Sequence, residues 1–338
     1  MSAPPRTAPI TPAMAFAFAL FLSLPLWIDA VGLYPYLGVE ILIWALYALS
    51  FNLLLGYTGL PSFGHGAYFG IGAYAFGLAQ FNLAANLWLC LAAAMLAAAF
   101  AGAIVAAFIS HRRGIYYALM TICFGQVFWF IAIKAHAVTG GEDGLLKIAR
   151  LPADFGFASF DLSGNTSLYY FVLAIFAVLA IALWRLVHSP YGRVLQAIKQ
   201  NETRATFVGY NVWLYKFSVF AISAGLSGLC GGLFAMAQAS AYPDVMSLHY
   251  SGYVVMMTLV GGGFVSFWGP VVGAATFFLA RDVIGAVTTS WMLWFGLLFM
   301  LVVLFRPEGL AGLWQDLRAG KRRTGGGTRG GLLAMLRR

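Results

Sequence analysis

The sequence predicts an all-α protein: a polytopic bundle of about ten transmembrane helices, within a range of eight to ten. Hydrophobic residues make up 62% of the 338 residues and charged residues only 9%, which is too little charge to cover the surface of a soluble domain. Apolar runs of about 20 residues recur, and a helix of that length crosses a hydrocarbon layer of about 30 Å. The 39 glycines fit this fold, because helices in lipid pack through close backbone approach.

The distribution of charge and of reactive side chains excludes several functions. The formal net charge is +9, but the basic residues lie in loops beside apolar segments, which indicates membrane orientation and not nucleic-acid binding. The three cysteines stand singly within apolar runs, without CxxC spacing. The sequence contains no HExxH, GxSxG or GxxxxGK[ST] motif. We therefore expect no catalytic residue, no metal and no cofactor or ATP site in this chain.

In chain order, we expect an N-terminal tail (1–12), a transmembrane domain (13–306) and a basic, glycine-rich tail (307–338). The first apolar run begins like a secretory signal peptide, but no small-x-small cleavage site follows it, which favours a retained helix. The predicted membrane segments are 13–30, 33–56, 62–80, 84–110, 115–137, 168–188, 215–240, 251–267, 268–287 and 291–306. The glycines in 62–80 and 251–287 predict re-entrant or broken helices there.

The positive-inside rule orients the bundle. With the loop 189–214 in the cytoplasm, sixteen Lys and Arg residues lie inside and four outside, which predicts an even number of spans and both termini in the cytoplasm. The loop 138–166 is then the longest extracytoplasmic segment. We expect the basic tail 307–338 to lie along the anionic inner leaflet.

A glycine-rich motif, GYTGLPSFGHGAYFGIGAY, runs from Gly56 to Tyr74. Proline and clustered glycine interrupt a helix and let backbone approach backbone or a solute. The motif therefore predicts either an interrupted helix that lines a pathway or a tight helix crossing. No second His, Asp or Glu lies near His65, which favours a hydrogen-bonded packing role over proton transfer or metal binding.

Two further glycine patterns concern packing. Ser62-Phe63 is followed by Gly66 and Gly70, and Ser266-Phe267 is followed by Gly269 and Gly273, which is either an internal repeat or a coincidence. Small residues also recur at helical spacing along AISAGLSGLCGGLFAMA (221–237), a pattern typical of a packing seam between helices.

A second motif, TGGEDGLL, follows the fifth predicted span and contains Thr139, Glu142 and Asp143. Its paired glycines permit a tight turn, and its two acids either meet a basic partner or remain solvated. The alternating ligands of a calcium loop are absent.

The third motif is the polar, basic segment from Ser189 to Asn211, SPYGRVLQAIKQNETRATFVGYN, between two apolar spans. Ser189-Pro190 is a helix start and Gly209 a helix stop. Val194, Ile198, Ala205 and Val208 share one face, so we expect a short amphipathic helix that is either gripped by a partner or rests on lipid headgroups.

Three ionisable residues, Glu40, Arg281 and Asp282, fall within apolar segments. Each lies toward the predicted outer end of its span, where snorkelling or an Arg281–Asp282 pair is favoured over a role in translocation.

Several motifs in the same order resemble one family. GYTGLPSFGHGAYFGIGAY, RGIYYALMT (113–121), TGGEDGL, SPYGRVLQAIKQNETRATFVGYN, LVGGGFVSFWGPVVGA (259–274) and LFRPEGL (304–310) together resemble the longer permease subunit of branched-chain amino-acid ABC importers. The resemblance covers roughly 33–310. It implies a type II-like importer permease in a bacterial cytoplasmic membrane.

The resemblance also implies partners: a second, homologous permease subunit, two cytoplasmic ATPase subunits that bind ATP and magnesium, and an extracytoplasmic solute-binding protein. We also expect the chain to contact membrane lipid and not to bind nucleic acid. The binding protein would meet Thr139, Glu142 and Asp143. Two of the spans would line the pathway and open alternately to the two sides of the membrane, so that a small neutral or zwitterionic solute can pass. Their expected pathway residues are Ser62, Gly64, His65, Gly66, Tyr68, Gly262 and Gly263.

The same resemblance makes the Ser189–Asn211 segment the coupling helix, which docks on an ATPase. Ala205 and Gly209 match the Ala-x-x-x-Gly core of the family's cytoplasmic motif, and Gly192-Arg193 match the Gly-Arg before it. Thr203 occupies the place of the motif's glutamate, with Glu202 one residue earlier, so the docking geometry departs from the pattern. The expected coupling residues are Gly192, Arg193, Glu202, Arg204, Ala205 and Gly209.

Two other functions compete with an importer. A transporter driven by an ion gradient normally needs carboxylates or broken polar sites at mid-membrane, and the sequence offers few. An integral membrane enzyme needs convergent His, Asp, Glu or Cys residues, which the sequence lacks.

Overall fold

The computed structural model describes residues 21–25, 34, 36–83, 86–154, 159–305 and 309–312. Its helices and strands are α2 (Tyr36–Asn52), the π-helix η1 (Leu53–Thr58), α3 (Gly66–Asn82), α4 (Leu87–Ile109), α5 (Gly114–Lys134), α6 (His136–Thr139), η2 (Gly141–Asp143), β1 (Leu145–Leu146), β2 (Ala153–Asp154), β3 (Ser159–Phe160), α7 (Asn165–His188), α8 (Pro190–Gln200), α9 (Glu202–Phe207), α10 (Val212–Gln238), β4 (Ser240–Ala241), η3 (Pro243–Met246), α11 (Leu248–Gly261), α12 (Gly269–Val287) and α13 (Trp291–Phe305). The strands form two antiparallel pairs, β1–β4 and β2–β3. The prediction of an all-α bundle is confirmed.

Six helices of the described part are long and apolar enough to cross a membrane: Tyr36–Thr58 (α2 with η1), α4, α5, α7, α10 and α12. They coincide with six of the ten predicted segments. Segments 62–80, 251–267 and 291–306 instead contain the shorter helices α3, α11 and α13, of 17, 14 and 15 residues. Most of segment 13–30, the tail 1–12 and most of the tail 307–338 lie outside the described residues.

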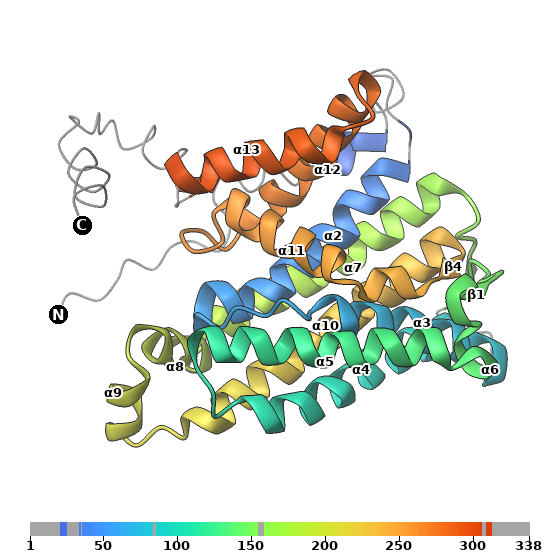
Figure 1. Ribbon diagram of the computed structural model, residues 1–338. Coiled ribbons are helices and arrows are strands. Elements are labelled where there is room, and N and C mark those ends of the chain that lie inside the picture. The colour runs from blue at the N-terminus through green and yellow to red at the C-terminus, as the bar shows by residue number, and fades with distance from the viewer. Residues whose placement is uncertain are drawn as a thin grey trace.

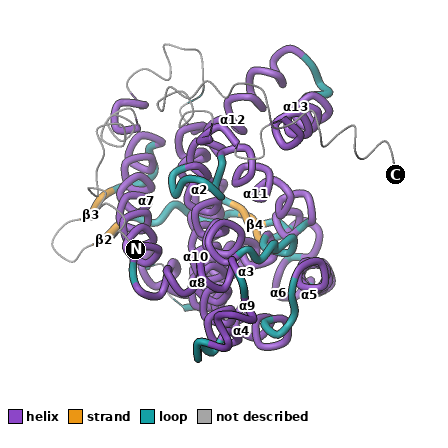
Figure 2. The backbone as a smooth tube through the Cα atoms, turned by 90° about the vertical axis from the view of Figure 1, so that its left-hand side faces the viewer, coloured by secondary structure: helices purple, strands orange, loops and turns teal. Residues whose placement is uncertain are grey.

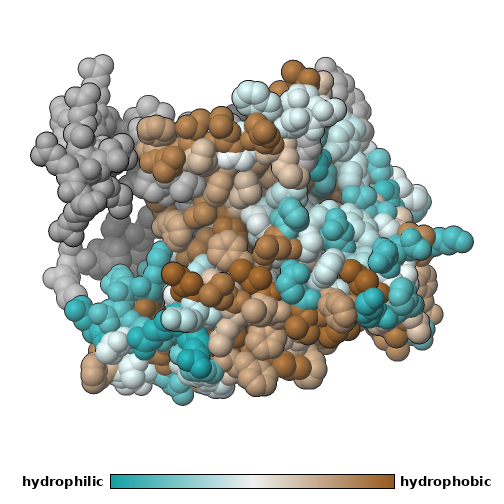
Figure 3. Space-filling view, viewed as in Figure 1, coloured by the Kyte–Doolittle hydropathy of each residue, from teal (hydrophilic) through white to brown (hydrophobic). Residues whose placement is uncertain are grey.

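The long helices lie side by side, and the polar connections gather at the two ends of the bundle (Figure 1). The helices α8 and α9 lie at one end, and α6, β1 and β4 lie at the opposite end. Figure 3 shows a hydrophobic band between hydrophilic surfaces at these ends. The loops 138–166 and 189–214 are thus at opposite ends, as the orientation derived from charge requires.

The helices α2 and α10 form the centre of the bundle (Figure 2). Every residue from Leu37 to Asn52 is buried by the chain itself. α10 packs against α4, α3 and α2. A helix that is apolar all round belongs in such a position, because no side of it needs to face water.

The small residues of α10 form the expected packing seam. A Cβ atom at Gly231 would fall on the carbonyl oxygen of Phe69 in α3, and one at Gly72 of α3 would fall on the carbonyl of Gly228. Such overlap means that the two backbones touch, which any larger side chain would prevent. The prediction of a seam over 221–237 is confirmed.

The echoed Ser-Phe motifs occupy similar places in the fold. Ser62 and Phe63 lie in the irregular stretch 59–65 before α3, and Ser266 and Phe267 lie in the irregular stretch 262–268 before α12. The glycines that follow begin the next helix in both cases, Gly66 in α3 and Gly269 in α12. The break at 262–268 lies within the predicted interruption in 251–287, whereas the break at 59–65 comes at the start of segment 62–80, most of which is the unbroken helix α3.

Three predicted intramembrane charges meet at the end of the bundle opposite α8. Arg281 pairs through Nε with Asp282 Oδ1 at 3.2 Å, which confirms the expected neighbour pair. The sequence did not indicate its second partner: Nη1 and Nη2 of Arg281 donate to both oxygens of Glu40 at 3.1 and 2.9 Å. Tyr34 Oη accepts a third hydrogen bond from Arg281, at 2.8 Å. This fork-shaped pair fixes the start of α2 to the end of α12.

We predict that Gly231→Ala weakens the packing of α10 on α3, because the added methyl group would overlap the Phe69 carbonyl and overpacking costs about 1–3 kcal/mol. The detergent-purified protein should unfold several degrees below the wild type in a thermal-shift assay. Gly252→Ala is the matched control, since a methyl group there meets no described atom within 4 Å. Equal melting temperatures for the two variants would contradict this account of the seam.

Candidate functional site

The segment 189–211 folds as two helices, so the prediction of one continuous amphipathic helix is wrong. Asn201 is extended (φ −162°, ψ 102°), ends α8 and caps α9 by accepting from the Arg204 amide through its side chain at 2.9 Å. An N-cap side chain competes with a continuing helix for the backbone amides. Here the Asn201 side chain accepts the amide hydrogen bond, so α8 ends and α9 begins. We call residues 189–211 the α8–α9 segment.

The predicted start and stop of this segment are confirmed. Ser189 Oγ accepts from the Gly192 amide at 3.5 Å, and Pro190 occupies the first turn of α8. At the other end Gly209 has φ +100°, and the amides of Gly209 and Tyr210 donate to the carbonyls of Thr206 and Ala205. This pair of bonds is a Schellman stop, which favours glycine because of the positive φ.

The α8–α9 segment has a small hydrophobic core of its own. Val194 and Ile198 of α8, Ala205 of α9 and Val212 at the start of α10 are buried together. Val208, predicted on the same face, is instead 71% exposed, because the break at Asn201 rotates α9 relative to α8. The segment is thus held to the bundle on one side.

The other side of the segment is exposed. Arg193, Arg204 and Phe207 all face solvent, and Phe207 is 87% exposed. Neither guanidinium group forms an ion pair within the described part of the chain. Gly192 is buried and serves the turn between α7 and α8, because a Cβ atom there would fall on the Val187 carbonyl.

A buried ion pair fixes α9 to the bundle. Glu202 Oε1 lies 2.6 Å from Nζ of Lys216 in α10, whose side chain is only 1% exposed. Glu202 Oε2 lies 2.8 Å from Nε of Arg113, at the start of α5. Lys216 Nζ also donates to the Arg112 carbonyl at 3.0 Å. Glu202 was expected among the coupling residues, and the structure gives it the further task of joining α9 to α5 and α10.

Lys199 extends from α8 to two segments rich in glycine, 56–74 and 259–274, which we call the glycine-rich segments. Its Nζ donates to the Gly56 carbonyl at 2.6 Å and lies 4.8 Å from the centre of the Phe264 ring. Partial burial of the amine lowers the pKa of Lys199 below its usual value. The sequence offered no signal for this contact, because 143 residues separate Lys199 from Gly56.

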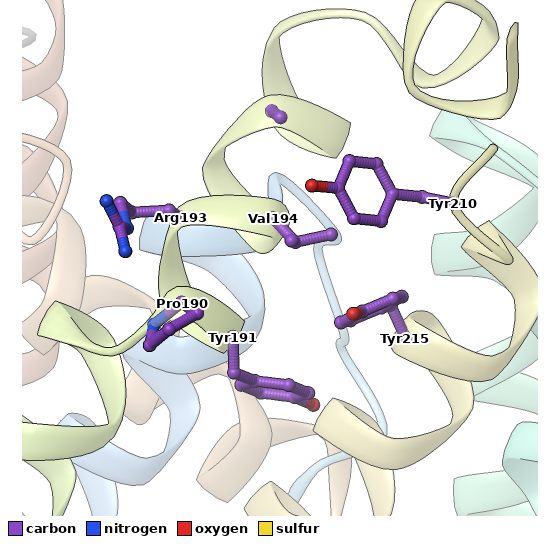
Figure 4. A pocket seen from close by; sticks show the side chains of 7 residues that line it. Pro190, Tyr191, Arg193, Val194, Tyr210 and Tyr215 are labelled. Atoms are coloured by element: carbon purple, nitrogen blue, oxygen red, sulfur yellow. The ribbon is translucent and has the colours of Figure 1, made fainter. Parts of the chain in front are cut away.

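A pocket of about 550 Å³ opens between α8 and the start of α10. Tyr191, Tyr210 and Tyr215 line it together with Pro190, Arg193, Val194 and Ala197 (Figure 4). Its walls are largely aromatic and aliphatic, so the pocket suits an apolar side chain.

The residues predicted to line a pathway are buried within this single chain: Ser62, Gly64, His65, Gly66 and Tyr68. Gly64 packs on the backbone of Thr121 in α5, whose Oγ1 accepts from the Phe63 amide at 3.1 Å. The Gly66 amide donates to Ser251 Oγ at 2.9 Å. Neighbouring helices thus satisfy the backbone where the helix is interrupted.

His65 makes a hydrogen bond of 3.0 Å between Nε2 and Ser223 Oγ of α10. Its ring stacks on Tyr47 and meets Phe51 edge-on. Both observations agree with the packing role inferred from the sequence.

The structure brings the two glycine-rich segments together. A Cβ atom at Gly56 would lie 2.9 Å from the Gly263 carbonyl oxygen, so these backbones are in contact. Gly262 has φ +85° and ends α11. The side chain of Asn52, 1% exposed, lies against both Gly56 and Gly263.

At the opposite end of the bundle, Thr139 and the two acids behave differently. Thr139 is buried and its Oγ1 donates to the carbonyls of Ala132 and Ala135, so it stabilises the turn. Glu142 and Asp143 in η2 are both exposed. Three glycines with positive φ, Gly140, Gly141 and Gly144, shape this turn and present the acids outward.

A family model described as "Branched-chain amino acid transport system / permease component" matches residues 36–305. The chain belongs to this family. It is therefore a transport component, the permease of a branched-chain amino-acid transport system, and not an enzyme. The match and the apolar helices together make it a multi-pass membrane protein.

Three curated relatives agree. The permease protein LivM of the high-affinity branched-chain amino acid transport system of Escherichia coli is 28% identical over 289 residues, which cover 80% of this chain and 68% of LivM. BraD of Pseudomonas aeruginosa, a permease protein of the same description, is 28% identical over 286 residues, covering 80% and 91%. A probable LivM of Methanocaldococcus jannaschii is 23% identical, covering 78% and 88%. No solved structure gives a significant match.

We predict that Lys216→Met loosens α9, because it leaves Glu202 with only the exposed Arg113 as a counter-ion. Breaking a buried pair from one side costs about 2 kcal/mol or more. Limited chymotrypsin digestion after Phe207 or Tyr210 should accelerate. The double variant Glu202→Gln/Lys216→Met removes both charges and should regain part of the protection. If the single variant digests at the wild-type rate, Lys216 does not fix α9.

Proposed function

We propose that this permease is the membrane-spanning subunit of an ATP-driven importer, and that the α8–α9 segment couples it to separate ATPase subunits. The proposal places α8 and α9, both termini and the tail 307–338 on the cytoplasmic side of a bacterial cytoplasmic membrane. The partners would be a second, homologous permease subunit, two ATPase subunits with ATP and magnesium, and an extracytoplasmic solute-binding protein.

The two-sided character of the α8–α9 segment carries the proposal. One side is fixed to the bundle by the buried core and by the Glu202–Lys216 pair. The other side presents the guanidinium groups of Arg193 and Arg204, which form no ion pair with any described residue, beside the exposed Phe207. Aromatic and arginine side chains are the residues that most often dominate a protein interface. The pocket lined by Tyr191, Tyr210 and Tyr215 would accept an apolar side chain of the ATPase.

In this mechanism, closure of the ATPase dimer shifts α8 and α9 and, through them, the interrupted helices. A shift follows only if the ATPase contacts differ between the two states. The pathway would open where the interrupted segments separate, at Ser62, Gly64, His65, Gly66, Tyr68, Gly262 and Gly263. Glycine backbones in contact can part without breaking interlocked side chains. The apolar and aromatic surroundings suit an amino acid with a hydrophobic side chain.

A transporter driven by an ion gradient is the competing function. It would need ionisable groups at mid-membrane, and in the described part the intramembrane ion pairs lie at the two ends of the bundle. Arg281 pairs with Glu40 at one end, and Lys216 pairs with Glu202 at the other. This arrangement favours the ATP-driven importer.

The test is reconstitution of the chain in liposomes with its candidate partners, with uptake of radiolabelled L-leucine as the readout. We expect uptake only with the ATPase subunits and with ATP on the side that holds α8 and α9. Phe207→Ser should reduce capture of the ATPase subunits about tenfold or more, because it removes an apolar anchor. Leu146→Ser, at an exposed position of the opposite end, is the control. Uptake driven by a proton or sodium gradient without ATPase subunits would reject the importer.

We further propose that Glu142 and Asp143 receive a basic surface of the solute-binding protein, with Thr139 supporting the turn. Glu142→Lys/Asp143→Lys should weaken the affinity of the binding protein for the permease in lipid nanodiscs, most strongly at low ionic strength, since rim charges act by long-range attraction. The neutral variant Glu142→Gln/Asp143→Asn should give an intermediate affinity. Unchanged affinity in both variants would place the docking surface elsewhere.

A further inference from the structure

One side chain of the α8–α9 segment reaches beyond its own core. Lys199 leaves α8 near its end, and its aliphatic stem crosses Gly59, where an added Cβ atom would lie 3.0 Å from the Lys199 Cγ. Its Nζ then meets the Gly56 carbonyl at 2.6 Å and the face of the Phe264 ring at 4.8 Å. One side chain thus contacts both glycine-rich segments.

The Gly56 carbonyl needs a donor from outside its helix. It lies in the last turn of a 23-residue helix, Tyr36–Thr58, where carbonyls lack intrahelical partners and the helix dipole is negative. The π-helical end closes on itself: Gly59 and Leu60 both donate to the Leu54 carbonyl. A lysine amine is suited to a carbonyl at such a helix end by both hydrogen bonding and charge.

The contact lies where the two glycine-rich segments touch. Gly56 packs on the Gly263 carbonyl, and Phe264 is the next residue along that segment. Both glycines surround the Asn52 side chain, whose Oδ1 and Nδ2 have no hydrogen-bond partner among the described residues. Among the described residues, the Asn52 side chain thus adds no hydrogen bond to this junction, and Lys199 bridges it from outside.

The two charged contacts of the α8–α9 segment differ in kind. Glu202 is held by Lys216, a fully buried side chain of α10, and by Arg113. Lys199 instead contacts a backbone carbonyl and a ring face at the edge of the bundle, and much of its own surface is exposed. The first contact anchors the segment, and the second connects it to the parts that are proposed to move.

We propose that Lys199 is the positioning residue that transmits movement of α8 to the junction of Gly56 and Gly263. The inference rests on the proposed function, since it requires an ATPase that moves α8. It assigns to Lys199 a role in coupling transport to hydrolysis and none in binding the ATPase, because its amine faces the bundle.

The test measures leucine uptake and ATP hydrolysis in the same proteoliposomes of the complete complex. Lys199→Met keeps the stem but loses the amine, and should lower uptake per ATP hydrolysed about tenfold, while capture of the ATPase subunits stays at the wild-type level. Lys199→Arg can still donate to Gly56 and should recover at least half of the lost ratio. The matched control is Lys134→Met, the same substitution at an exposed lysine at the end of α5 away from the α8–α9 segment, which should keep the wild-type ratio.

A wild-type ratio in Lys199→Met would overturn the inference. So would an equal fall of uptake and hydrolysis together with reduced capture of the ATPase subunits, since that pattern indicates a purely structural role. Failure of the proposed function is distinguishable, because the wild-type chain itself would then capture no ATPase and show no uptake that depends on ATP.

Discussion

Helix interruptions inside a membrane must have every backbone group satisfied by protein, because the hydrocarbon offers no hydrogen bonds. Among the described residues two such interruptions lie at 59–65 and 262–268, and neighbouring helices supply partners for the backbone there. Thr121 of α5 accepts from the Phe63 amide, Ser251 of α11 accepts from the Gly66 amide, and Lys199 of α8 donates to the Gly56 carbonyl. The enclosure of α2 by the rest of the chain and the close glycine contacts of α3, α10 and α12 both follow from the need to bury these breaks.

Charged side chains contact both ends of the buried rod, the stretch Tyr36–Thr58 formed by α2 and η1. At one end Glu40 receives two hydrogen bonds from Arg281, which ties the rod to α12. At the other end Lys199 caps the Gly56 carbonyl, and the Glu202–Lys216 pair lies nearby on α9 and α10. Placing an ionised group at mid-membrane costs several kcal/mol, and placing it near the membrane surface costs much less. The positions near the two ends therefore have the lower free-energy cost. The buried stretch Tyr36–Thr58 thus contacts α8 at one end and α12 at the other.

The proposed mechanism depends on how the α8–α9 segment buries one side and exposes the other. Its break at Asn201 turns α9 so that Val208 and Phe207 become exposed while Ala205 stays buried. In a single continuous helix Val208 would share the face of Val194 and Ile198, so its exposure reflects the break. The chain belongs to a family of branched-chain amino-acid transport permeases. In the proposed mechanism the ATPase binds the exposed side chains of Arg193, Arg204 and Phe207. Lys199 then connects the movement of α8 to the interrupted helices.

Sequence alone predicted the helical membrane fold, the seam of α10 and the ends of the α8–α9 segment at Ser189 and Gly209, and it offered broken helices at 62–80 and 251–287 as one of two readings. These features depend on composition and on interactions within about a turn of helix, which a linear pattern records. The break at Asn201 had such a signal, an N-cap residue followed by an acidic first turn, which the pattern of apolar residues around it obscured. Only the tertiary structure decided that three of the apolar segments form short helices, and that Arg281 meets Glu40, Lys216 meets Glu202 and Lys199 meets Gly56. Those pairs join residues distant in sequence, and their energy comes from geometry and burial that exist only once the helices have packed.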